Sequence, residues 1–296
     1  MTLKQNHSML PVFSLLVAAT MWGVVWYPLR LLEEQGLHGL WASLIGYGVA
    51  LLMGLIWLAR SKAKWPGHPL AFSLMVLAVG WCNVAFVLAV LEGTVVRVML
   101  LFYLSPLWAL ILGWLLLNEK PTRLSWLIFV VGLVGALIML WDENIGFPWP
   151  RDRADWLAVS SGLAFSFSNV MMRYVGDVDI VYKANASWLG VVVIAALWIL
   201  FAGIEWPSVS TATLSGAVLL GVFGFFVMSL VVIYGVTHMP VHRSAVILLF
   251  ELVIGAVSSM LLTDEVILIR EWVGGFLILF SSTLAAREHL DEGQAV

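Results

Sequence analysis

The residue with the clearest potential for chemistry is Glu251, which stands inside the apolar stretch ILLFELVIG at 247–255. It is the only charged residue between positions 244 and 263. An ionisable side chain near the centre of a membrane-spanning segment costs about 2.5 kcal/mol or more, unless a partner, a cavity or a proton compensates. Glu251 is therefore a candidate for proton coupling or for binding a cationic group.

The polar residues around Glu251 form a stripe. At 100° per residue, Ser244, Gly255 and Ser258 lie within about 60° of Glu251 on a helix. In lipid such a stripe faces protein, and its small residues let another helix approach closely. Two interpretations stay open. Glu251 either makes a structural hydrogen bond or ion pair, or it exchanges protons or binds a substrate amine, since burial disfavours its ionised form.

Other apolar segments carry candidates for substrate contacts. Trp22 and Trp26 are four residues apart and share a helix face, and Ser166 and Asn169 also follow helical spacing. An indole opposite a hydroxyl and an amide would suit a zwitterion with a flat side chain. Packing between helices is the competing interpretation for all four residues. Three more segments contribute one candidate each, namely Asn83, Tyr103 and Tyr234.

Three residues are predicted to have structural roles. Pro106 removes one backbone hydrogen bond from its helix and leaves the Phe102 carbonyl without its usual donor. A broken helix at membrane depth is tolerated where it is buried or lines a cavity, although a plain packing kink is the alternative. Glu119 and Glu265 follow the ends of apolar segments, where negative charge is unfavourable. We expect them to serve the N-termini of the helices that follow them in the chain.

The elements that position these residues are membrane helices. Of 296 residues, 62% are hydrophobic and 11% are charged, less than half the fraction typical of soluble domains. Charge-poor runs of about the length of a bilayer span predict an all-α polytopic membrane protein with ten transmembrane helices. The runs are 8–29, 39–59, 69–91, 98–118, 124–141, 156–172, 184–204, 206–237, 244–263 and 272–286.

Charge also bears on partners and orientation. The net charge of −3 leaves no basic patch for nucleic acid, so we expect a lipid bilayer and a small molecule as partners. Assigning loops alternately to the two sides places ten basic residues on the side of the N-terminus and five opposite. The positive-inside rule then predicts a bacterial inner-membrane protein with both termini in the cytoplasm. Arg30 and Arg173 are expected to snorkel to the membrane surface.

The chain repeats internally. A shift of 146 residues lays 96–126 on 242–272 and superposes Arg97 on Arg243, Glu119 on Glu265 and Trp126 on Trp272. Each half has five predicted helices, an odd number, so the second half enters the membrane from the opposite side. We predict a first repeat at 8–141, a linker at 142–155, an inverted second repeat at 156–287 and a cytoplasmic tail at 288–296.

These features resemble a known family. Trp22-Gly23 in the first helix and LSPLWALILGWLLLNE at 104–119 are similar to motifs of EamA-type members of the drug/metabolite transporter superfamily. In the second half the family usually has Glu-Pro where this chain has Glu251-Leu252. The resemblance implies transport of small metabolites, often the export of amino acids.

The function predicted from the sequence is secondary transport. Inverted repeats are common in transporters that alternate access to a midplane site. The chain has no Gly-rich phosphate loop, no His-Glu-x-x-His and no Cys-x-x-Cys, so we expect no enzyme activity, no metal and no cofactor. A proton-coupled exporter is the main hypothesis and a facilitative uniporter is its nearest alternative. A membrane enzyme or a purely structural bundle is more distant.

The inverted arrangement predicts the sidedness of two loops. In a Cys82→Ala background, which removes the single native cysteine, cysteines placed in the 61–68 loop and in the 142–155 linker should react from opposite sides of the membrane. The measurement is labelling of oriented vesicles with a membrane-impermeant thiol reagent. Labelling of both positions from the same side would contradict the inverted repeats.

Overall fold

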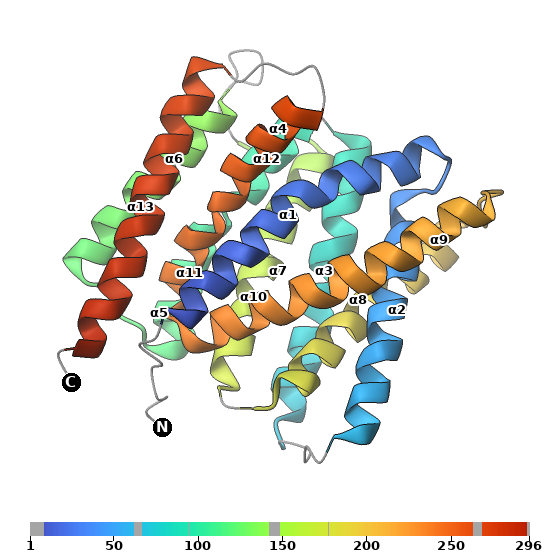
Figure 1. Ribbon diagram of the computed structural model, residues 1–296, viewed down its shortest axis with the longest axis horizontal. Coiled ribbons are helices and arrows are strands. Elements are labelled where there is room, and N and C mark those ends of the chain that lie inside the picture. Colours follow the sequence, from blue (N-terminus) through green and yellow to red (C-terminus); the bar gives the residue numbers. More distant parts are fainter. Residues whose placement is uncertain are drawn as a thin grey trace.

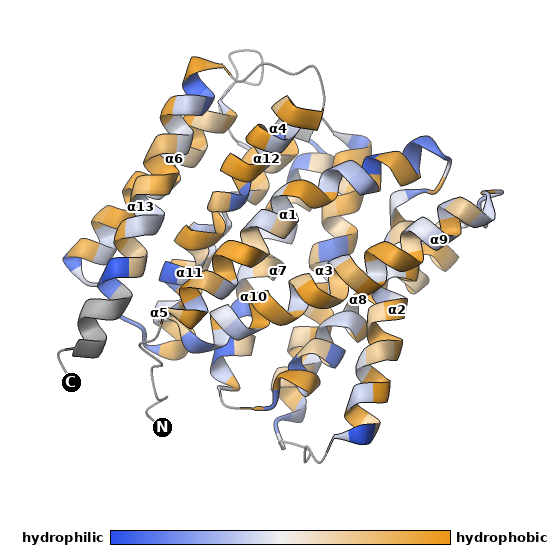
Figure 2. Ribbon diagram, in the orientation of Figure 1, coloured by the Kyte–Doolittle hydropathy of each residue, from blue (hydrophilic) through white to orange (hydrophobic). Residues whose placement is uncertain are grey.

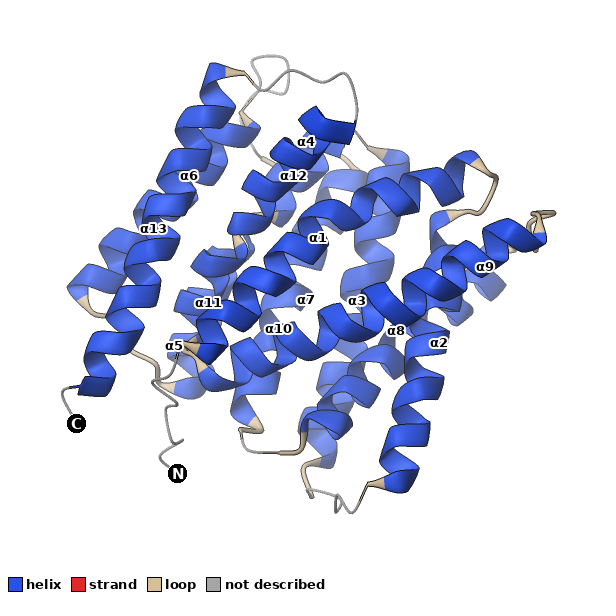
Figure 3. Ribbon diagram, viewed as in Figure 1, coloured by secondary structure: helices blue, strands red, loops and turns tan. Residues whose placement is uncertain are grey.

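The computed structural model describes residues 9–61, 67–93, 95–141, 149–176, 178–262 and 268–294. All regular secondary structure within these ranges is helical (Figure 3). The first half of the chain forms α1 (Leu10–Glu34), α2 (Gly39–Arg60), α3 (Pro69–Glu92), α4 (Val95–Phe102), α5 (Ser105–Leu117) and α6 (Arg123–Leu140). The second half forms α7 (Arg153–Tyr174), α8 (Ile180–Ala202), α9 (Thr211–Leu219), the π-helical η1 (Leu220–Phe225), α10 (Phe226–His238), α11 (Val241–Leu248), α12 (Phe250–Leu262) and α13 (Ile269–Gln294).

The helices have the lengths and composition of membrane spans. Counted over the described residues, nine helices or consecutive helix groups are long and apolar enough to cross a bilayer. α4 with α5, α9 through α10, and α11 with α12 each contribute one span. α7 fills the remaining expected segment with 22 residues, and it carries several serines, Asn169 and Arg173. The prediction of an all-helical, multi-pass membrane protein is confirmed.

Large apolar side chains cover the outside of the bundle. Phe201 is 88% exposed and Leu200 is 76% exposed, and many other leucines and aromatic residues also face outward. Figure 2 shows hydrophobic residues along most of the helix surface, with hydrophilic ones mainly toward helix ends. An apolar belt of this extent is the surface that a bilayer requires of a bundle.

The order of the helices in space brings the two halves of the chain together. α3 packs against α7 and α8, α6 lies beside α13, and α1 packs against α10 and α12 (Figure 1). α4 and α5 both pack against α7. Most large contacts therefore join a helix of the first half to one of the second. The start of α1 and the end of α13 lie toward the same end of the bundle (Figure 1).

Side-chain oxygens define where several helices begin. A side chain just before the first turn accepts a hydrogen bond from a backbone N–H of that turn, which would otherwise lack a partner. Such caps are well determined by sequence, because serine, threonine and aspartate are the usual residues at this position. They occur at α6, α7, α8 and α9, where the capping residues are Thr122, Asp152, Asp179 and Ser210.

Glycines set the closest approach between helices, most clearly where α3 meets α8. A Cβ atom added to Gly80 would collide with the backbone of Gly190, and one added to Gly190 would collide with the backbone of Val76. Small residues at such crossings allow backbone-to-backbone packing, which drives helix association when lipid removes the hydrophobic contribution.

Gly80→Ala should therefore lower the free energy of unfolding by about 1–3 kcal/mol, because the new methyl group must push two backbones apart. Gly48→Ala is the matched control, since a Cβ atom on Gly48 meets nothing within 4 Å. Thermal unfolding of the purified variants should show a lower Tm for Gly80→Ala alone. Equal Tm values for the two variants would contradict the contact between α3 and α8.

Candidate functional site

The helix that contains Pro106 is broken. α4 ends at Phe102 and α5 begins at Ser105, with Pro106 in the first turn of α5. The hydroxyl group of Ser166 on α7 donates to the carbonyl oxygen of Ser105 at 2.7 Å. Gly162, one turn earlier on α7, lies against the carbonyl group of Phe102. The interruption is thus covered by α7, which meets the rule that irregular backbone at membrane depth must be buried or line a cavity.

The second half of the chain is interrupted at the matching place. Leu249 separates α11 from α12, and a shift of 146 residues places it on Tyr103. Around it the backbone hydrogen bonds tighten to three-residue spacing, from the Leu249 N–H to the Val246 carbonyl and from the Leu252 N–H to the Leu249 carbonyl. No proline stands in this segment. The helix is therefore interrupted without the proline that the family usually has.

The two interruptions meet. Tyr103 and Leu249 belong to one buried apolar cluster, together with Leu252. The phenol of Tyr103 and the carboxyl group of Glu251 are neighbours that interact electrostatically. Among the described residues no basic side chain lies within ion-pair distance of Glu251. The geometry thus pairs Glu251 with a neutral hydroxyl rather than with a cation.

Aromatic rings surround the first interruption. The ring of Phe102 lies 5.0 Å from that of Phe86, 5.4 Å from that of Tyr103 and 5.6 Å from that of Phe165, centroid to centroid. These rings come from α3, the break itself and α7. The Tyr103 hydroxyl therefore stands at the edge of an apolar wall, with Glu251 as its polar neighbour.

The polar stripe of α12 faces α1, as the helical spacing predicts. The Ser258 hydroxyl donates to the Gly23 carbonyl oxygen at 2.9 Å, and the Trp26 indole N–H donates to the Ser258 hydroxyl at 2.9 Å. A Cβ atom on Gly23 would collide with Ile254 and with the backbone of Glu251. Gly23 therefore allows α1 and α12 to touch next to the carboxylate.

Trp22 and Trp26 have different surroundings despite their shared face. Trp22 lies 6.3 Å from the ring of Phe225, which in turn stacks on Tyr47 with centroids 4.3 Å apart. Trp26 instead contacts Tyr27 and bonds to Ser258. Of the two candidates, the structure brings only Trp26 into contact with the stripe that contains Glu251.

Two asparagines have polar groups without protein partners. The side-chain oxygen of Asn83 on α3 is buried and, within the described part of the chain, has no hydrogen-bond partner. Asn169 on α7 is 6% exposed, and no hydrogen bond to its amide is found among the described residues. Buried polar groups are normally paired, so an unpaired amide is available to a bound polar molecule or to water. Because α3 and α7 pack against each other, the two asparagines lie on neighbouring helices.

Comparison with known proteins agrees with this geometry. Residues 9–141 and residues 152–287 each match the profile of the EamA-like transporter family. The chain belongs to this family. A solved structure titled "Crystal structure of protein" is similar in fold, with a TM-score of 0.77, 16% sequence identity and coverage of 94% of this chain and 96% of that chain. The comparison with curated proteins found no match.

Membership of the EamA-like transporter family identifies the broad functional class of the protein. This chain is a multi-pass membrane transporter of the drug/metabolite type, and its substrate is a small molecule. The family consists of transporters rather than enzymes. The family profile matches twice in succession, once in each half of the chain.

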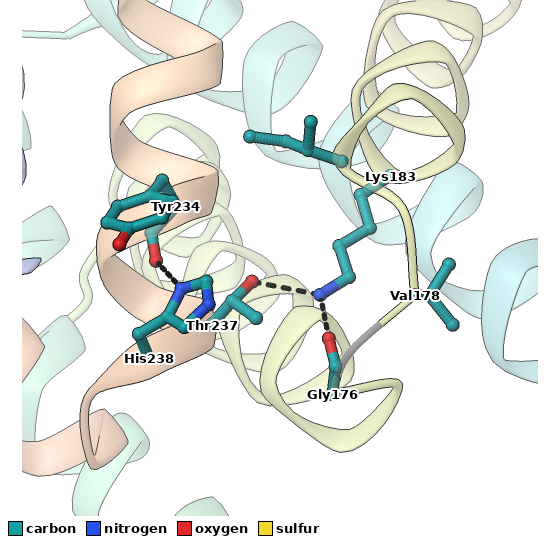
Figure 4. A pocket seen from close by; sticks show the side chains of 7 residues that line it. Gly176, Val178, Lys183, Tyr234, Thr237 and His238 are labelled. Atoms are coloured by element: carbon teal, nitrogen blue, oxygen red, sulfur yellow. Dashed lines mark hydrogen bonds between the residues drawn. The ribbon is translucent and has the colours of Figure 1, made fainter. Parts of the chain in front are cut away.

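Tyr234 of this EamA-type chain lies in a separate cavity near the helix ends. The cavity has a volume of about 140 Å³ between the start of α8 and the end of α10. Figure 4 shows Lys183 there, with its ammonium group donating to the Thr237 hydroxyl at 2.9 Å and to the Gly176 carbonyl. His238 bonds to the backbone carbonyl of Tyr234. No described contact joins Tyr234 to Glu251, so the structure does not bring these two candidates together.

Two sequence-based expectations about charged residues are wrong. Arg173 does not snorkel, because its side chain is 3% exposed and bonds to Glu119 at 3.0 Å. Glu119 does not serve α6, which is capped by Thr122. Its second oxygen instead accepts the N–H of Val241 at the start of α11, at 2.9 Å. Negative charge is favourable there, at a helix N-terminus.

The remaining charged residues are divided between the surface and the interior. Arg30 pairs with Glu34 at an exposed helix end, where both side chains are more than half exposed. Arg243 and Glu288 form an ion pair that sequence reasoning missed, at 3.3 Å and with both side chains buried. Charged residues are rare in this chain, so Arg243 and Glu288 stand out in the sequence. A single sequence does not reveal which acidic residue forms an ion pair with which basic residue. Glu265 lies outside the described residues.

Trp26→Phe should lower the free energy of unfolding by about 0.6 kcal/mol, and by up to about 1.7, because it removes the indole donor to Ser258 and keeps an aromatic ring. Trp22→Phe is the control, since no hydrogen bond of Trp22 is found in the described ranges. Thermal unfolding of both variants provides the comparison. A Trp26→Phe variant no less stable than Trp22→Phe would show that the bond does not hold α1 to α12.

Proposed function

We propose that the chain is a secondary transporter that exports small organic metabolites such as amino acids. Two inverted five-helix repeats, 8–141 and 156–287, joined by a linker at 142–155, would alternate access to a site between them. The excess of basic residues on the N-terminal side supports a position in the bacterial inner membrane with both termini in the cytoplasm.

The observation that carries this proposal is the meeting of two helix interruptions at Glu251. The Glu251 carboxyl group stands where α11–α12 is interrupted and interacts electrostatically with Tyr103 where α4–α5 is broken. Irregular backbone in transporters marks the places where substrates and coupling ions bind. An acid without a basic partner among the described residues can release a proton when it takes up a cationic group.

The substrate contacts follow from the neighbouring side chains. We place a substrate amine at Glu251 and Tyr103, and an apolar or aromatic side chain against the Phe86, Phe102 and Phe165 rings. The amide of Asn169 and the unpaired side-chain oxygen of Asn83 supply hydrogen-bonding groups for the polar parts of the substrate. Trp26, Ser166 and Pro106 act indirectly, because their contacts hold the helices around this site.

Proton coupling separates this proposal from a facilitative uniporter. Both mechanisms use the same two repeats, and both allow exchange of substrate across the membrane. Only the coupled transporter accumulates substrate at the expense of a pH gradient. A screen of amino acids by thermal shift supplies the probe, because a ligand that binds only the folded state raises Tm.

Glu251→Gln should keep the shape of the side chain and its polar contact with Tyr103 but remove titration. In inverted vesicles with an acidic interior, the variant should still exchange labelled substrate and should lose at least about nine tenths of the accumulation driven by the pH gradient. Glu34→Gln is the matched control, because it removes an exposed carboxylate at a helix end. Undiminished gradient-driven accumulation by Glu251→Gln would falsify proton coupling and leave the uniporter.

A further inference from the structure

The broken helix α4–α5 is fastened to α7 by an ion pair at each end. At one end Arg97, in the first turn of α4, bonds to Asp155 in the first turn of α7, at 2.7 Å. At the other end Glu119, just beyond α5, bonds to Arg173 in the last turn of α7, at 3.0 Å. All four side chains are at most 15% exposed. We call these pairs the Arg97 lock and the Glu119 lock.

The two locks lie at opposite faces of the membrane. Asp155 and Arg173 are separated by 18 positions on one helix, or about 27 Å at 1.5 Å per residue. This length is close to the hydrocarbon thickness of about 30 Å. Each lock therefore stands where a path from one face toward Glu251 and Tyr103 would begin.

Each lock holds one piece of the broken helix. Arg97 is on α4 and Glu119 follows α5, while the interruption between the pieces lies against α7 at Ser166. Pro106 lacks a backbone N–H and the hydrogen bonds around it are irregular, so few bonds must change when the two pieces move separately and the break can act as a hinge. α4 can therefore leave α7 at one end while α5 stays bound at the other.

Further hydrogen bonds connect each lock to other parts of the chain. Arg97 also donates to the Trp149 carbonyl at 2.6 Å, and Asp155 accepts the Arg151 N–H at 2.8 Å. At the other end Arg173 donates to the Thr237 carbonyl at the end of α10. Glu119 accepts the first N–H of α11. Opening either end therefore requires the charged side chains to give up their protein partners and bind water instead. Water is available because each lock lies near a membrane surface.

We propose that the Arg97 lock and the Glu119 lock are the two gates of the transporter and open in alternation about the break at Tyr103. The proposal rests on the proposed alternating access of the two repeats. It adds the residues that close each face and the helix pieces that carry them. Loss of the Arg97 pair shifts the protein toward a state open at that end, and loss of the Glu119 pair shifts it toward the opposite state.

The test uses a single cysteine between the gates. Ser105→Cys in the Cys82→Ala background changes one atom at the break, where Ser105 is 5% exposed. A membrane-impermeant thiol reagent added to vesicles of either orientation then measures access from each face. Labelling requires neither substrate nor transport, so this test fails independently of the proposed function.

Asp155→Asn should raise the labelling rate roughly tenfold from the Arg97 face alone, and Glu119→Gln should raise it comparably from the opposite face alone, because a buried charge left unpaired favours opening to water. Arg97→Lys and Arg173→Lys keep the positive charge and should give smaller increases in labelling rate from the same faces. These two variants replace Asp155→Asn and Glu119→Gln in the test if the latter do not fold. Glu34→Gln should leave both rates unchanged. Unchanged rates in folded lock variants, or equal increases from both faces, would overturn the proposal.

Discussion

The rest of the structure depends on how the interrupted helices satisfy their backbone groups inside a bilayer. Lipid offers no hydrogen bonds, so every freed carbonyl or N–H needs a partner within the protein. At the first interruption α7 covers the irregular backbone, since Gly162 packs against the freed Phe102 carbonyl and Ser166 donates to the Ser105 carbonyl nearby. This contact explains why α7 carries Gly162 and Ser166 at these two positions.

The second interruption is stabilised by hydrogen bonds within its own chain segment. It places a titratable group, Glu251, near the middle of the α11–α12 span. Three-residue hydrogen bonds carry the backbone through Leu249, and α1 approaches α12 at Gly23. Glu251 then lies between α1 and the break in α4–α5, with Tyr103 as its partner. The same contact that compensates a carboxyl group inside a membrane span therefore links the two halves of the chain. A group so placed responds to any relative movement of the halves, which is what coupling requires.

Much of this arrangement could be predicted from the sequence. Length and polarity predict the membrane helices, and helical spacing predicts that Ser258 and Gly255 share the face of Glu251, the face that meets α1. Pro106 predicts a break, because a missing N–H acts locally. The interruption at Leu249 has no such marker, since it depends on tertiary packing. The partners of Glu119 and Arg173 were also missed, because they lie 54 positions apart and no local pattern pairs them.

The central claim is that the two interruptions are coupled through the interaction between Tyr103 and Glu251. A double-mutant cycle with Tyr103→Phe and Glu251→Leu, each of which removes one polar group of the pair, tests it most directly, with the free energy of unfolding of the purified protein as the measured quantity. The two changes should be non-additive, with an interaction energy of about 0.5–3 kcal/mol. Additivity within about 0.3–0.5 kcal/mol would mean that the side chains act independently and would contradict the account.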